Sequence, residues 1–67
     1  MTQVKVGDRV ELTGPMVDEP DPIPVGTKGT VTFINELTGL GSRQIAVNWD
    51  GGRRLMLSDP PDQFRVL

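Results

Sequence analysis

The sequence predicts an all-β fold, a small five-stranded barrel that forms a single domain over residues 1–67. Three observations lead to this prediction. Glycine or proline interrupts nearly every window of ten residues, which leaves no space for an amphipathic helix. Apolar residues alternate at period two in five short segments separated by turn signals. An open sheet of this size would expose long edges, so closure into a barrel is favoured.

The first two strands lie in the N-terminal half of the chain. The first is broken at Gly7-Asp8 and carries its apolar residues on one parity. These apolar residues are Val4, Val6, Val10 and Leu12. Val31 and Phe33 alternate with threonines and form the second strand. Ile34 falls out of phase there, which indicates a bulge or a strand end.

The remaining strands form the C-terminal half. Alternating apolar residues, Ile45, Val47 and Trp49, define the third strand. Leu55 and Leu57 flank Met56 in the fourth, and Phe64 and Val66 flank Arg65 in the fifth. The segment "DPPDQF" between the last two predicts a tight turn or a single 3₁₀ turn.

Register arithmetic predicts the hairpin at Asp50–Gly52. A loop of these three residues places Trp49 opposite Arg53, and it keeps the apolar residues of both strands on one face, whereas either two-residue loop mixes the faces. We expect a type I turn closed by Gly52 in the left-handed region. Trp49 is then a core residue with Arg53 beside its indole. The outward residues are Ala46, Asn48, Arg54 and Met56.

Two loops are expected to be long. Thr13–Thr30 contains four prolines, which favour an extended, polyproline-like backbone, and it carries three clustered acids. These acids are Asp18, Glu19 and Asp21. The second loop, Glu36–Arg43, presents Leu37 and Leu40, which we expect at an exposed tip or folded back onto the barrel.

Composition excludes several chemistries. The chain has no cysteine and no histidine, so it forms neither a disulfide nor a thiolate or imidazole metal site. The acidic cluster fits no standard cation loop, and we expect no cofactor, no metal and no enzyme activity. The net charge of −2 counts against nucleic acid as the main partner. Without an apolar run of about 20 residues or a charged leader, a cytoplasmic location is expected.

Several motifs carry a resemblance to a known family. "PIPVGTKGTV", "VNWDGG" and "DQFRVL", taken together, resemble a small domain of unknown function found in phages and bacteria. That resemblance implies an SH3-like barrel in a phage or bacterial accessory protein, with no assigned activity. The opening "VGDRV" also resembles the strand-entry turn of KOW- and Tudor-like barrels, a much broader class. The length of "NELTGLGSR" departs from the tight turn that such domains often have between their second and third strands.

Two functions remain open. The leading one is a non-catalytic protein-binding module that acts through its long loops, because loops at one end of such barrels carry function. Its candidate binding residues are Asp18, Glu19, Asp21, Leu37, Leu40, Arg43 and Arg54. Self-association through the same leucines is also possible. The alternative is RNA or DNA binding by Arg43, Arg53 and Arg54 with Trp49 or Phe33 stacking on a base, unless the acidic loop neutralises the arginines.

Overall fold

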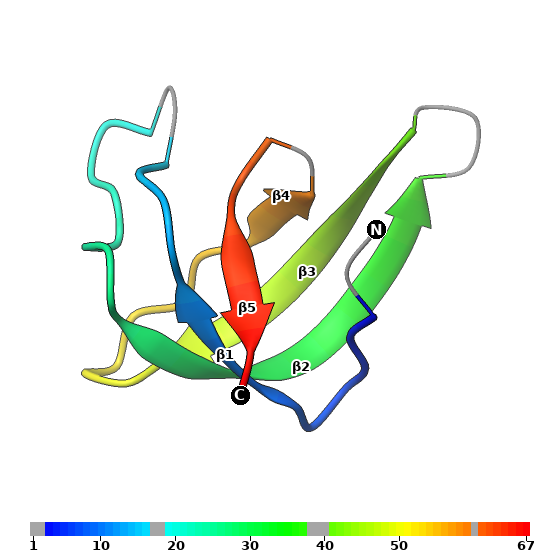
Figure 1. The fold of residues 1–67 in the computed structure, drawn as a ribbon, viewed down its shortest axis with the longest axis horizontal. Coiled ribbons are helices and arrows are strands. Elements are labelled where there is room, and N and C mark those ends of the chain that lie inside the picture. Colours follow the sequence, from blue (N-terminus) through cyan, green and yellow to red (C-terminus); the bar gives the residue numbers. More distant parts are fainter. Residues whose placement is uncertain (1–2, 17–18, 38–40, 60) are drawn as a thin grey trace.

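The computed structural model describes residues 3–16, 19–37, 41–59 and 61–67. Its strands all pair antiparallel in one sheet with the order β4-β3-β2-β1-β5 (Figure 1). The strands are β1 (Arg9–Leu12), β2 (Lys28–Leu37), β3 (Ser42–Trp49), β4 (Leu57–Asp59) and β5 (Phe64–Val66). The all-β prediction is therefore confirmed. Within these ranges, no helix is long and apolar enough to cross a membrane.

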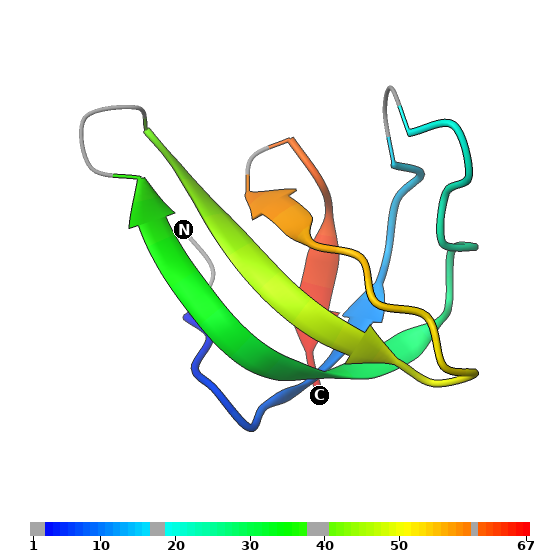
Figure 2. The same cartoon turned by 180° about the vertical axis from the view of Figure 1, so that it is seen from behind.

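The sheet curls without closing. β4 and β5 form its two edges, and in the described part of the chain neither pairs with the other (Figure 2). The turn that joins them is held at Ser58, whose N–H donates to the Asp62 carboxylate at 2.8 Å and whose carbonyl accepts from the Asp62 N–H at 2.7 Å. These bonds occupy main-chain groups on the outer edge of β4, which is how small sheets protect an edge from further pairing.

The core lies inside this curl. Its buried apolar residues are Val10, Leu12, Met16, Ile23, Val31, Ile45, Val47, Trp49, Leu57 and Phe64. Met16 and Ile23 belong to the proline-rich loop, and the sequence analysis did not place them in the core. This loop therefore covers one end of the sheet with two side chains of its own, and that burial compensates for the sheet's failure to close.

β2 is the long strand that joins the two halves of the sheet. Gly29 on β2 pairs with Val10 on one side and with Trp49 on the other. A Cβ at this position would lie 2.5 Å from the Cγ1 of Val47 and 2.7 Å from the Asn48 carbonyl oxygen. Glycine is thus required here because the strands approach too closely for any side chain.

The bulge in β2 lies earlier than the sequence indicated. Val31 pairs with Val47, but Phe33 rather than Thr32 pairs with Ala46, so Thr32 is the extra residue. The side-chain alternation is reset at this point. Phe33, which the alternation had placed on the same face as Val31, is consequently 57 % exposed, and Ile34 packs partly against the core.

Two further expectations need correction. Val6 is exposed, because the chain turns at Lys5–Asp8 before β1 begins, with the Asp8 N–H donating to the Lys5 carbonyl. The second loop is shorter than expected. Leu37 pairs with Ser42 and Glu36 with Arg43, so four residues of the segment continue the β2–β3 ladder.

Candidate functional site

The β3–β4 hairpin has the predicted register. Ile45 pairs with Leu57 and Asn48 with Arg54, and the Trp49 N–H donates to the Arg53 carbonyl at 2.8 Å. Both pairings agree with a three-residue loop over Asp50–Gly52. The prediction from matching the apolar faces is confirmed.

The turn inside that loop differs from the predicted type. Gly52 has the expected positive φ of 96°, but Gly51 also has a φ of 101°. The Gly52 N–H donates to the Trp49 carbonyl at 3.1 Å, which makes Gly51 the third residue of a four-residue turn. A positive φ at that position is required by a type II turn and excluded by a type I turn. The glycine pair therefore supplies two successive left-handed residues.

Trp49 is a core residue, as predicted. It is 2 % exposed, and its indole Nε1 donates to the Leu55 carbonyl at 2.9 Å. Tryptophan in a core usually finds such an acceptor because a buried N–H without one costs free energy. The indole is thus committed to the inside of the fold and offers no exposed stacking surface.

An ion pair ties the hairpin loop to β1, and a main-chain hydrogen bond ties it to β2. The Arg9 guanidinium donates two hydrogen bonds to the Asp50 carboxylate, from Nη1 to Oδ1 at 2.9 Å and from Nη2 to Oδ2 at 2.7 Å. The Asp50 N–H donates to the Lys28 carbonyl at 2.8 Å. The hydrogen bonds from Arg9, partly opposed by desolvation, lower the pKa of the Asp50 carboxyl from its usual value.

Replacing Asp50 with asparagine tests this contact through pH. A lowered pKa in the folded state means that the ionised carboxylate stabilises the fold above its unfolded pKa, near 4. That contribution disappears as the pH falls through the folded-state pKa. We therefore expect Asp50→Asn to melt at a lower temperature than the parent at pH 7 and at the same temperature once the Asp50 carboxyl of the parent is protonated. Thermal melts from pH 7 to 2 measure this, and a difference independent of pH would contradict it.

Arg53 is occupied by the proline-rich loop. Its Nη2 donates to the Asp21 carbonyl at 2.6 Å and lies 3.5 Å from the Asp21 carboxylate, and its Nη1 donates to the Pro22 carbonyl at 3.4 Å. The acidic loop therefore does lie beside this arginine. Arg53 acts as a brace between the hairpin and the loop, which sequence alone left undecided.

Arg43 lies at the other end of β3 and is buried. It is 6 % exposed and forms an ion pair with Asp59 on β4, its cross-strand neighbour. The pair joins the two strands where the β4 edge ends. A buried, paired guanidinium is unavailable to a partner, so the structure separates Arg43 from the other two arginines.

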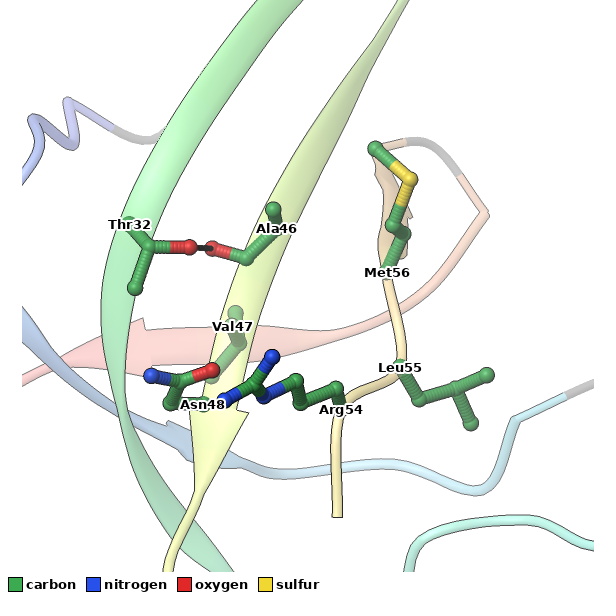
Figure 3. A pocket seen from close by; sticks show the side chains of 7 residues that line it. All are labelled: Thr32, Ala46, Val47, Asn48, Arg54, Leu55 and Met56. Carbon is green, nitrogen blue, oxygen red and sulfur yellow. Dashed lines mark hydrogen bonds between the residues drawn. The ribbon is translucent and has the colours of Figure 1, made fainter.

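Arg54 alone keeps the character expected of a binding residue. It is exposed, and the described residues place no hydrogen bond or ion pair on its guanidinium. Figure 3 shows it extending across the sheet towards Asn48. The two side chains border a hollow of about 350 Å³. The hollow is lined by Thr32, Ala46, Val47, Asn48, Arg54, Leu55 and Met56.

The hollow lies where the β3–β4 ladder opens. Pairing is present at Ile45–Leu57 and at Asn48–Arg54, but the two positions between them are unpaired. The chain diverges there because the Leu55 carbonyl accepts its hydrogen bond from the indole of Trp49. Val47 lines the hollow although its side chain is in the core, so its main chain forms part of the floor.

Exposed apolar side chains accompany the hollow. Met56, 41 % exposed, forms part of its wall, and Phe33 lies beside Ala46 as its cross-strand partner. Thr32 donates to the Ala46 carbonyl at 3.3 Å and so closes the bulge on the same side (Figure 3). We call this surface the outer face. It comprises Thr32, Phe33, Ala46, Asn48, Arg54 and Met56.

The other predicted binding residues contribute less. Glu19 is half-buried and accepts the Asp21 N–H at 3.5 Å, while Leu37 is the last residue of β2. Asp18 and Leu40 lie outside the described residues. Over the described ranges, no group of three carboxylates is placed to hold a metal ion.

The sequence did not predict that the residues of the outer face form one surface. The residues Ala46, Asn48, Arg54 and Met56 were expected to point outwards, but Phe33 was expected on the same face as the buried Val31. The signal in the sequence was that Val31 and Ile34 are both apolar but three residues apart, which breaks the period-two alternation. Such a break indicates a bulge, and either residue between them could have been the extra residue. A bulge at Thr32 places Phe33 outside, beside the residues already expected there.

Comparison with known proteins identifies a family for this chain but no individual relative. Neither the curated proteins nor the solved structures include a match to this chain. The model of one family, described as a domain of unknown function (DUF4314), matches residues 2–67. This match spans the whole sheet, the proline-rich loop and the outer face. The chain therefore belongs to the DUF4314 family.

Proposed function

We propose that this protein is a non-catalytic protein-binding module and that it binds its partner on the outer face rather than through its long loops. The observation that carries the proposal is Arg54, an exposed cation without a described partner at the border of a hollow with apolar walls. Every other described arginine is engaged by a carboxylate. A lone arginine beside exposed apolar side chains is the composition that protein interfaces favour.

The apolar part of the outer face supports the same function. Phe33 and Met56 are large side chains left exposed on a chain whose core is small. Grouped on one face around a hollow, such side chains are typical of an interaction surface, whereas scattered single ones are not. Methionine suits this role because its flexible thioether adapts to different partners.

Nucleic acid binding is the less favoured function. Of the residues it would use, Trp49 is in the core, Arg43 is buried against Asp59, and Arg53 is held by Asp21, which leaves Arg54 and the exposed Phe33. Only Arg54 remains to meet a phosphate, and a single contact releases too few counterions for tight binding. We expect no measurable binding of a 20-nucleotide single-stranded RNA at about 150 mM salt by fluorescence anisotropy.

Selection from a displayed peptide library tests the proposal. We expect the intact protein to enrich peptides that lose at least about tenfold in affinity when Phe33 and Met56 are both replaced by serine, because both side chains are desolvated on binding. Each of the two is exposed, so the double variant is expected to remain folded. Isothermal titration of the selected peptides measures the loss.

A matched variant on another surface serves as the control. Val6 and Val25 are also exposed apolar residues, and replacing both with serine removes the same kind of surface away from the hollow. We expect this variant to bind like the parent. Equal binding by both double variants, or a selection that yields no peptide, would overturn the proposal.

A further inference from the structure

We propose that the hollow on the outer face is a carboxylate-binding site and that it receives an aspartate or glutamate side chain of an extended peptide. Three donors meet the carboxylate: the Arg54 guanidinium, the Asn48 side-chain amide and the main-chain N–H of Val47. This inference rests on the proposed function and names the chemistry of its partner.

The Val47 donor follows from the pattern of the sheet. In an antiparallel sheet, the main-chain N–H and C=O groups of every second residue in a strand point towards the same neighbouring strand. The Trp49 N–H points towards the β4 side, because it donates to the Arg53 carbonyl. The Val47 N–H, two residues earlier in the same strand, therefore points to that side as well. Its ladder acceptor would be the Leu55 carbonyl. No pairing forms at that position, and this carbonyl accepts the indole Nε1 of Trp49 instead.

The N–H of Val47 is thus left on the floor of the hollow without its ladder acceptor. An incoming carboxylate oxygen would accept from this N–H in place of the ladder carbonyl. The position is set by the fold itself. Burying Trp49 draws the Leu55 carbonyl inwards, and the same shift opens the ladder.

Arg54 and Asn48 supply the remaining donors at the rim. They are cross-strand partners, and Figure 3 shows the guanidinium near the Asn48 amide with both beside the opening. Arginine binds a carboxylate through two parallel N–H donors, which a point charge cannot reproduce. Arg54 is the only charged residue among those that line the hollow, so no described carboxylate there competes with the ligand.

The surroundings of the hollow indicate a peptide rather than a free anion. Ala46, Leu55 and Met56 line it with apolar surface, and Phe33 lies next to Ala46. In an extended peptide, residues two apart project from the same side. A carboxylate on Arg54 therefore places the next side chain of that parity on the sheet, where Phe33 and Met56 would cover an apolar one.

Nuclear magnetic resonance titration with defined peptides tests the inference. The probe is the pentapeptide Ser-Glu-Thr-Leu-Ser, acetylated and amidated at its ends, and its partner probe has glutamine in place of glutamate. We expect the glutamate peptide to move the Val47 amide proton downfield. The glutamine peptide and the Arg54→Gln variant are each expected to weaken binding by about tenfold, the usual effect of losing a charge-assisted hydrogen bond.

Three controls make the result specific. Lys5→Gln makes the same change of charge outside the lining of the hollow and is expected to bind like the parent. Arg54→Lys keeps the charge without the paired donors and is expected to recover only part of the affinity. The glutamine peptide with a free carboxyl terminus tells a terminal carboxylate from a side-chain one. We expect it to bind no better than its amidated form.

The outcomes separate the two proposals. If library-selected peptides bind the outer face but are indifferent to Arg54→Gln, the carboxylate site is wrong and the protein-binding function stands. A glutamate pentapeptide that leaves the Val47 amide unmoved at millimolar concentration overturns the site as well. If the library selection yields no peptide that binds the outer face, the proposed protein-binding function is wrong, and the carboxylate site that rests on it is wrong as well.

Discussion

Replacing Trp49 with alanine is expected to remove a large part of the free energy of unfolding at 25 °C. Large-to-small changes at a buried tryptophan cost about 3–5 kcal/mol. A chain of 67 residues has a free energy of unfolding of only about 3–10 kcal/mol, at roughly 0.05–0.15 kcal/mol per residue. Trp49 is also 2 % exposed and bonds the Leu55 carbonyl, so its loss removes packing and a buried hydrogen bond together. Far-ultraviolet circular dichroism with urea denaturation measures the effect.

Trp49→Phe is the matched variant. It keeps an aromatic ring in the core but removes the Nε1 donor, so we expect a folded protein that is less stable than the parent. The Leu55 carbonyl is then free to accept from the Val47 N–H, which would close the gap in the ladder. Slower hydrogen exchange at the Val47 amide in this variant would show it. A Trp49→Ala protein with an unchanged melting curve would contradict the core assignment.

Asp59→Ala is expected to have the next largest effect. It leaves the Arg43 guanidinium buried without its carboxylate, and breaking a buried ion pair on one side costs about 3–5 kcal/mol. Asp59 is on the edge strand β4 and Arg43 is its neighbour on β3, so losing their ion pair also loosens β4. Urea denaturation followed by circular dichroism measures the change in the free energy of unfolding.

The double variant Arg43→Met with Asp59→Ala is the control. Methionine fills the space of the arginine stem without a buried charge, and such replacements are often neutral or stabilising. We expect the double variant to recover most of the stability that Asp59→Ala loses. Equal destabilisation by Asp59→Ala and by the double variant would show that packing, rather than the unpaired charge, sets the cost.

The candidate site divides into residues that sequence could assign and residues it could not. Arg54 was predicted to face out because the hairpin register follows from matching apolar faces across one short loop. Arg43 was expected to be a binding residue and Arg53 to lie beside the Trp49 indole, and the sequence assigned a carboxylate partner to neither. Their partners, Asp59 and Asp21, are 16 and 32 residues away along the chain, and no local pattern specifies such pairs.

By itself, the sequence determined the all-β class, the β3–β4 register and the burial of Trp49, because period-two alternation and turn length are local properties. The tertiary structure decided the rest. The bulge at Thr32 turned Phe33 outwards, since the extra residue is defined only against the partner strand. The gap at Val47 has the same origin: a buried indole competes for the Leu55 carbonyl, and only the folded chain brings the two together.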